Sequence, residues 1–109
     1  NMIVAIPTEM DSLNSKISER FARTAYFLIY NTNDDSYEFI SHEMLQEHGA
    51  GTKIVNELSV RNVEAVISKN IGKNALQALK VGNIKAYIAS AGNVKENIDF
   101  LKSKKLQEF

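Results

Sequence analysis

The chain has 109 residues, of which 44% are hydrophobic and 24% charged, and this composition favours a single globular domain spanning residues 2–109. Its thirteen basic residues balance thirteen acidic ones, so it lacks the positive surplus that non-specific nucleic-acid binding requires. The absence of cysteine excludes disulfides, thiolate nucleophiles and thiolate-ligated metal centres, and it fits a reducing compartment. Because no apolar run approaches the ~20 residues that span a bilayer, we expect a cytoplasmic protein without a membrane partner.

The first part of the chain predicts three strands. Residues 2–6 form a continuous apolar run that Pro7 closes, which is typical of a central strand covered on both faces. Residues 23–30 are rich in β-branched and aromatic side chains, so they predict a second strand. Residues 36–41 alternate between polar and apolar side chains, as an edge strand with one solvated face does. We expect these strands to form an antiparallel meander.

The rest of the chain predicts helices that alternate with short strands. Apolar stripes at helical spacing indicate three helices, and two short apolar runs between them indicate buried strands. The helices cover residues 52–61, 73–81 and 94–102, and the strands cover residues 64–68 and 84–88. Strand–helix–strand units imply parallel pairing with right-handed crossovers. The order β-β-β-α-β-α-β-α therefore predicts an α/β fold with a five-stranded mixed sheet, and Gly82 stands where a helix C-terminal cap belongs.

All three helices begin in segments rich in glycine and asparagine, namely residues 48–52, 68–74 and 90–95. In this topology the three helix N-termini share the edge outside the carboxyl ends of the parallel strands, where open α/β sheets bind ligands. A helix N-terminus presents unpaired N–H groups and a partial positive charge. Converging N-termini therefore predict an electropositive hollow that holds an anion.

The glycines support this prediction more than the charges do. Gly49, Gly51, Gly72 and Gly92 would let the backbone approach a ligand closely or adopt a positive φ, although strand-to-helix turns alone also favour glycine. Basic residues only slightly outnumber acidic ones in these loops. Charge by itself is therefore weak evidence for the anion site.

Several segments, in order and at matching spacing, resemble the dinitrogenase iron–molybdenum cofactor biosynthesis family of NifX-type accessory domains. They are residues 3–7 (IVAIP), 17–23 (ISERFAR), 48–51 (HGAG), 70–75 (NIGKNA) and 92–96 (GNVKE). The resemblance implies a ribonuclease-H-like three-layer α/β/α fold with the antiparallel meander at one side. It also implies a domain that carries a metal–sulfur cluster or its precursor between donor and acceptor proteins, without being an enzyme. Ala22 departs from the pattern, because the family usually has glycine there, and this weakens the case for a ligand contact by that loop.

The candidate contacts for such a cofactor are Arg20, Arg23, His48, Gly49, Gly51, Asn70, Gly72 and Asn93. His48 is the candidate metal ligand because imidazole binds iron, and its alternative is a solvent-exposed loop histidine. Arg20 and Arg23 could clamp a sulfide-rich anion, a phosphate or a carboxylate, or could instead pair with Glu19 or Glu9 on the surface.

Other residues of these loops favour structural roles. Asn70 and Asn93 are expected to cap helices through their side chains. Phe21 is expected to fill the core under its loop. Met10 and Met44 carry thioethers that suit a soft metal, but packing is the expected role of both.

Three functions remain open from the sequence. The first is the non-catalytic cluster carrier. The second is an enzyme, which we disfavour because the strand at residues 2–6 lacks the carboxylates of a two-metal nuclease and no P-loop or catalytic triad is present. The third is a module that binds a small anionic metabolite or a partner protein, with homodimerisation through the exposed edge strand at residues 37–40.

Overall fold

The computed structural model describes residues 2–41 and 50–109, and in these ranges it shows the expected order of strands and helices. The elements are β1 (Ile3–Thr8), β2 (Tyr26–Asn31), β3 (Tyr37–Ser41), α1 (Ala50–Val60), β4 (Ala65–Ser68), α2 (Lys73–Val81), β5 (Lys85–Ile88) and α3 (Val94–Lys102). The strands form one sheet in the order β3-β2-β1-β4-β5. Strand β1 pairs antiparallel with β2 and parallel with β4, so the five-stranded mixed sheet is confirmed.

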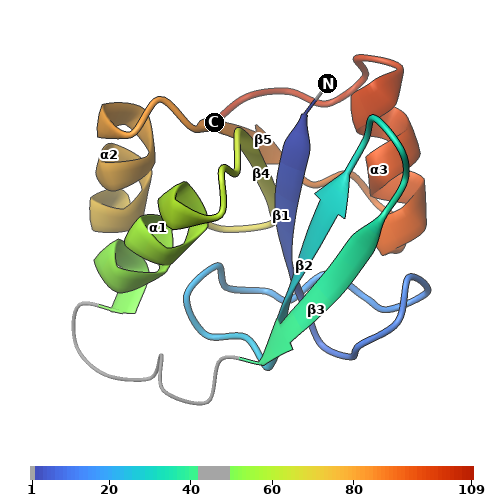
Figure 1. The fold of residues 1–109 in the computed structure, drawn as a ribbon, viewed down its shortest axis with the longest axis horizontal. Coiled ribbons are helices and arrows are strands. Elements are labelled where there is room, and N and C mark those ends of the chain that lie inside the picture. The colour runs from blue at the N-terminus through green and yellow to red at the C-terminus, as the bar shows by residue number, and fades with distance from the viewer. Residues whose placement is uncertain (1, 42–49) are drawn as a thin grey trace.

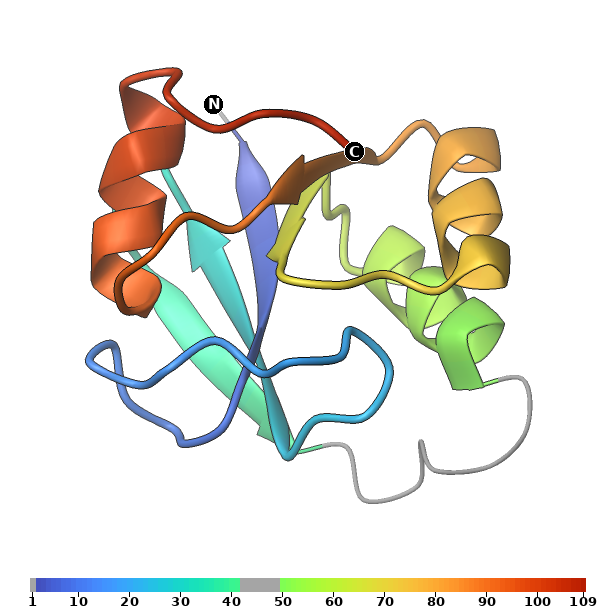
Figure 2. The same cartoon turned by 180° about the vertical axis from the view of Figure 1, so that it is seen from behind.

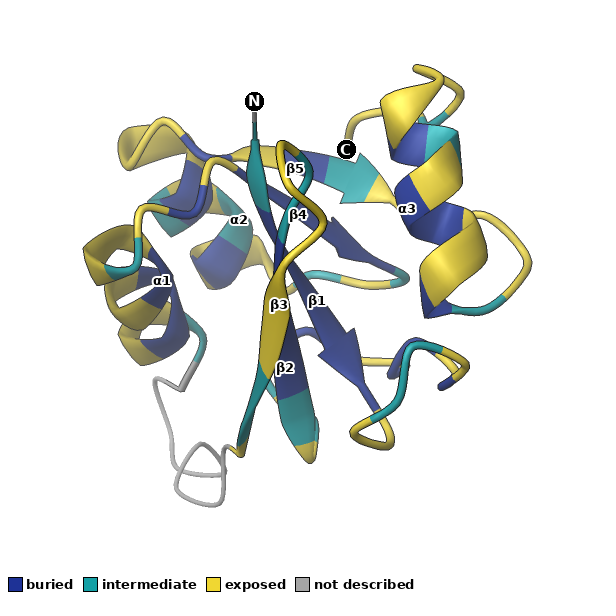
Figure 3. Ribbon diagram, turned by 45° about the vertical axis from the view of Figure 1, so that its right-hand side comes forward, coloured by how far each residue is buried: buried dark blue, intermediate teal, exposed yellow. Residues whose placement is uncertain are grey.

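Helices cover both faces of the sheet, which gives the three-layer α/β/α arrangement. Helices α1 and α2 lie on one face and α3 lies on the other (Figures 1 and 2). Strand β1 is central, as expected, and its alternating side chains enter two separate cores. Ala5 faces the core under α1 and α2, whereas Val4 and Ile6 face the core under α3, and all three are fully buried. Figure 3 shows this contrast between the buried central strands and the exposed edge strand β3.

Strands β1 and β2 differ most from the sequence prediction, whereas β3, β4 and β5 each begin one residue later than predicted and end where predicted. Strand β1 continues through Pro7 to Thr8. Its pairing with β4 already ends at Ala5, so the N–H that proline lacks is not needed for a hydrogen bond to β4. The Pro7 carbonyl instead accepts a hydrogen bond from the Ser18 N–H at 2.8 Å. Strand β2 begins only at Tyr26, because the Thr24 hydroxyl bonds the carbonyls of Thr8 and Tyr26 and holds the preceding residues in a loop.

The C-terminal cap of α2 also differs in detail. Gly82 occupies the cap position, but its φ is −81°, within the range of any residue. Asn83 takes the left-handed conformation instead, with φ 62°. Asparagine tolerates this region better than other residues with a side chain, so the turn does not depend on the glycine.

The two edges of the sheet differ. The C-terminal segment crosses from α3 to β5, where the Ile88 N–H bonds the Gln107 carbonyl at 2.7 Å and the Phe109 N–H bonds the Ala86 carbonyl at 2.9 Å. Figure 2 shows this crossing beside the chain termini. At the other edge, β3 pairs only with β2 among the described residues. The part of the chain that the structure describes contains no helix of the length and apolarity that a membrane span requires.

Candidate functional site

The three helices begin at the same edge of the sheet, outside the carboxyl ends of β1, β4 and β5 (Figure 2). The first turns of α1 and α2 are in direct contact there. A Cβ added to Gly51 would lie 2.9 Å from the Cβ of Ala75, closer than real Cβ atoms come. Gly51 therefore lets two helix N-termini lie side by side, and their partial positive charges reinforce each other.

The N-terminus of α2 is open. Its N-cap is Gly72, in an extended conformation, and no side chain caps the helix. Among the described residues, the N–H groups of Lys73, Asn74 and Ala75 have no hydrogen-bond partner. Apart from Gly72 and its chain neighbours, no atom of residues 2–41 or 50–109 lies within 4 Å of the place where a Cβ on Gly72 would stand. Gly72, Lys73 and Asn74 are exposed and Ala75 is buried, so an exposed helix N-terminus carries unused donors, and such N-termini bind anions.

The N-terminus of α3 is closed by the protein itself. The Asn93 side chain accepts from the Glu96 N–H at 2.9 Å, and the Glu96 carboxylate accepts from the Asn93 N–H at 2.9 Å. The Val94 N–H bonds the Ser15 carbonyl at 3.0 Å, and the Lys95 N–H bonds a second carbonyl in the same loop at 3.1 Å. The capping role expected for Asn93 is confirmed. The expectation that all three helix N-termini offer free donors to one anion is wrong for α3.

A residue that the sequence analysis missed holds the loop before α3 in place. Asn97 is fully buried, and its side chain bonds both the N–H and the carbonyl of Ser90 and also the carbonyl of Asn93. Its position was detectable in the sequence, because it interrupts the apolar stripe of Val94, Ile98 and Leu101 with a polar side chain. A buried amide of this kind is retained only when its bonds are satisfied.

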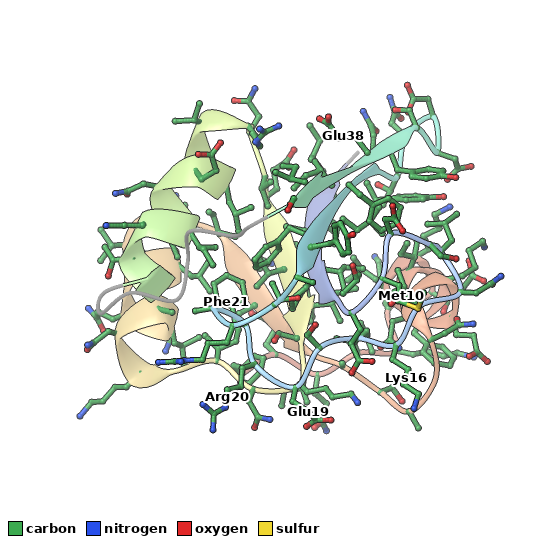
Figure 4. All side chains as sticks on the ribbon, turned by 90° about the horizontal axis from the view of Figure 1, so that it is seen from below. Met10, Lys16, Glu19, Arg20, Phe21 and Glu38 are labelled. Atoms are coloured by element: carbon green, nitrogen blue, oxygen red, sulfur yellow. The ribbon has the colours of Figure 1, made fainter. Side chains whose placement is uncertain are left out.

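The loop between β1 and β2 crosses this edge from one face of the sheet to the other. Ile17 enters the core under α3, and Phe21 enters the core under α1 and α2. Phe21 is 1% exposed and meets the ring of Phe27 edge-on at 5.3 Å between centroids, so its expected role as a core plug is confirmed. Figure 4, seen from this edge, shows Phe21 pointing inward, and Glu19 and Arg20 pointing outward.

Backbone and side-chain bonds tie this loop to the segment that precedes α2. The Phe21 N–H bonds the Asn70 carbonyl at 3.1 Å, and the Asn70 side-chain amide bonds the Glu19 carbonyl at 3.0 Å. The Lys69 ammonium pairs with the Glu19 carboxylate at 3.1 Å. The expectation that Asn70 caps α2 is wrong, because Gly72 occupies the cap and Asn70 joins two loops instead.

The two candidate arginines are exposed and unpaired within the described residues. Arg20 and Arg23 form no ion pair with Glu9 or Glu19, and the Glu19 carboxylate is already engaged by Lys69. The surface pairing considered for these arginines is therefore absent. Arg20 directly precedes Phe21, whose N–H bonds the Asn70 carbonyl, so this part of the loop is tied to the segment that leads into α2.

Metal ligands are scarce at this edge. In the described ranges, no three His, Asp or Glu side chains are grouped closely enough to hold a metal ion, and the chain has no cysteine. His48, Gly49 and Met44 lie outside the described residues. Met10 is 63% exposed, so the packing role expected for it is wrong.

Comparison with known proteins gives a consistent result over the whole chain. A family model described as "Dinitrogenase iron-molybdenum cofactor" matches residues 2–104. A putative NifB protein from Thermotoga is 38% identical, with a TM-score of 0.87 over 99% of this chain and 93% of that chain. A putative dinitrogenase from Methanocaldococcus jannaschii is 31% identical, with a TM-score of 0.72 over 100% of this chain and 95% of that chain. The apo form of the orange protein from Desulfovibrio gigas has a TM-score of 0.92 at 20% identity over 99% and 92% of the two chains, which shows the fold alone.

Proposed function

The chain belongs to the dinitrogenase iron–molybdenum cofactor family, and on that premise we propose that it is a non-catalytic carrier of an anionic metal–sulfur cluster. The cargo is a cluster of the iron–molybdenum or iron–sulfur type, or its precursor, held at the edge where α1 and α2 begin. The observation that carries the proposal is the contact between these two helix N-termini, with the first amides of α2 unoccupied among the described residues. Donors fixed by two helices bind an anion without having to reorganise.

Side chains around these helix N-termini have the matching charge. Arg20 lies on the neighbouring loop without an acidic partner in the described residues, and Lys73 is the exposed first residue of α2. A guanidinium donates up to five hydrogen bonds and suits the sulfide or oxide edge of a cluster. His48 and Gly49 are proposed as further contacts, with His48 as a metal ligand.

The ligand chemistry suits a carrier that passes its cargo on. With no thiolate in the chain, the cluster would be held by hydrogen bonds, charge and at most an imidazole. Few strong bonds then need to break when a donor or acceptor protein exchanges the cluster. We propose such metal-cluster donor and acceptor proteins as the partners of this chain.

Catalysis has little support from the same edge. Strand β1 carries no carboxylate, and its residues from Val4 to Thr8 are buried. A two-metal phosphoryl-transfer site would require acidic side chains at this position. A metal-dependent turnover of nucleic acid by the purified protein would contradict the non-catalytic assignment.

Anaerobic reconstitution tests the proposal. The protein is incubated with iron, sulfide and molybdate and then separated by gel filtration, and we expect a metal chromophore to co-elute with it. Lys73→Gln should lower the metal retained, whereas Lys80→Gln removes the same charge at the other end of α2 and should not. Arg20→Ala and His48→Ala test the two proposed side-chain contacts. No co-eluting chromophore, or equal retention by the Lys73 and Lys80 variants, would contradict the proposal.

The second candidate function is a module that binds a small anionic metabolite or a partner protein at the same edge, without a metal cargo. The observation in its favour is that α3 contributes no free donors, so fewer helix N-termini are left than the three that a large cluster was expected to meet. Homodimerisation through β3 remains part of this candidate, because β3 is an edge strand and Tyr37 is 51% exposed. Light scattering that shows a monomer at every concentration would remove the dimer.

A further inference from the structure

A separate cavity of 570 Å³ lies at the opposite end of the sheet from the helix N-termini. It is bounded by the first residue of β5 (Lys85), the last turn of α3 and the segment that crosses from α3 to β5. This volume falls within the range of sites for small organic ligands. None of the features used for the cluster carrier belongs to this cavity.

The cavity combines an apolar floor with a cationic rim. Leu101 is 6% exposed, and Leu106 and Tyr87 pack against the same core under α3. Three lysines line the cavity as well, together with Met2 and Thr32, and none of the described residues that line it is acidic. These lysines are Lys85, Lys102 and Lys104.

Two of the three ammonium groups are available for a ligand. Lys102 is engaged, because it donates to the Asp35 carboxylate at 2.7 Å, and this hydrogen bond lowers the pKa of Asp35. Lys85 and Lys104 have no ion-pair partner among the described residues. Two unpaired cations beside an apolar floor are complementary to a molecule that has an anionic group and an apolar body.

The wall of the cavity is fixed by the fold. The Lys105 N–H bonds the Phe100 carbonyl at 2.9 Å, and the Lys104 N–H bonds the Leu101 carbonyl at 3.0 Å, which closes the turn after α3. The segment then pairs with β5 through Gln107. Leu106 lies beyond residues 2–104, the range that the family model matches, so part of this wall is outside the family pattern.

From this arrangement we infer that the cavity is a second binding site, for an organic anion with an aromatic or aliphatic body. The anionic group, a carboxylate, sulfonate or phosphate ester, lies between Lys85 and Lys104. The apolar body lies on Leu101, Leu106 and the ring of Tyr87. The site is independent of the proposed carrier function, because it shares no residue with the edge where α1 and α2 begin.

Amide NMR titration of the full chain tests this site with three probes. They are 2-naphthalenesulfonate, its neutral analogue 2-naphthalenemethanol, and sulfate as a charge without an apolar body. We expect the sulfonate to shift amide signals at residues 85–88 and 101–106, and to bind about tenfold more tightly than either other probe. Equal affinity for the sulfonate and the alcohol would overturn the inference, as would the absence of shifts at millimolar sulfonate.

Charge variants identify the contacts. Lys85→Gln combined with Lys104→Gln should weaken sulfonate binding about five- to tenfold. Lys105→Gln is the matched control, because Lys105 is an exposed neighbour that does not line the cavity, and it should leave binding unchanged. Equal losses in both variants, or no loss in the double variant, would overturn the inference. Metal retention by the same variants reports separately on the carrier proposal.

Discussion

The N-termini of α2 and α3 have similar sequences and opposite environments. Both follow a parallel strand through a short loop with glycine and asparagine, and both lie at the same edge of the sheet. Helix α3 begins with a side-chain cap and has its first amides bonded to a neighbouring loop. Helix α2 has the exposed Gly72 at its N-cap, and in the described part of the chain no side chain caps it. A helix N-terminus is therefore available to a ligand only if the rest of the fold leaves its donors unused.

The loop that closes α3 also shapes the open end of α2, because it crosses between the two. Ile17 anchors it on the α3 side, and Phe21 anchors it on the side of α1 and α2. One loop therefore occupies the donors of α3 and is also bonded, next to Arg20, to the segment that precedes α2. Single substitutions on either side of this loop test whether a change at the N-terminus of one helix affects the N-terminus of the other.

The largest effect is expected from Phe21→Ala. Removing a ring that is 1% exposed should lower the free energy of unfolding by about 3–5 kcal/mol. Urea denaturation measures the loss. Exposed Arg20→Ala is the control and should change stability by less than about 0.5 kcal/mol. A loss below about 1 kcal/mol for Phe21→Ala would show that the loop is not anchored by this ring.

Gly51→Val tests the contact between α1 and α2. The new side chain would meet the rigid Cβ of Ala75, and overpacking of this kind costs about 1–3 kcal/mol. Thr52→Val creates the same residue at the next, exposed position and serves as the matched control. Thermal unfolding compares the two variants. Equal melting temperatures would mean that the helices do not meet at Gly51.

Asn93→Ala opens the closed helix N-terminus. It removes the cap of α3 and should lower the free energy of unfolding by about 1 kcal/mol, the usual cost of a lost N-cap. Hydrogen exchange should become faster at Glu96, whose N–H loses its acceptor. Unchanged exchange at Glu96 would contradict the capping geometry.

Gly72→Asp closes the open helix N-terminus, and its effect on stability is the smallest. An aspartate at the N-cap accepts hydrogen bonds from the first turn and interacts favourably with the helix dipole, so stability should rise by about 0.3–1 kcal/mol. The same carboxylate should compete with any anion at α2 and reduce metal retention. A variant that retains as much metal as the unmodified chain would place the cargo elsewhere.

The order and pairing of the elements followed from local patterns. The uninterrupted apolar run at the start of the chain identified the central strand, and the alternation in residues 36–41 identified the edge strand. Such patterns report burial directly, because one or both faces of a strand must be covered. The bounds of α2 and α3 also followed from apolar spacing, whereas α1 (Ala50–Val60) begins two residues earlier and ends one residue earlier than the predicted range 52–61.

The site was less predictable, because it depends on contacts between distant segments. The amides of α3 are occupied by carbonyls of the loop after β1, and no local pattern at Asn93 could show this. The need for glycine at Gly51 comes from Ala75 on another helix. Asn70 looked like a helix cap from its neighbours, but its partner is the Glu19 carbonyl. The contacts of His48 and Gly49 stay predictions.

The most direct test is an anaerobic amide NMR titration with tetrathiomolybdate, a small anion that contains only molybdenum and sulfur. We expect the signals of Lys73, Asn74 and Ala75 to shift and saturate, and those of Val94 and Glu96 to stay unchanged. Shifts at the start of α3, or no shift at the start of α2, would contradict the claim that the open helix N-terminus receives the cargo.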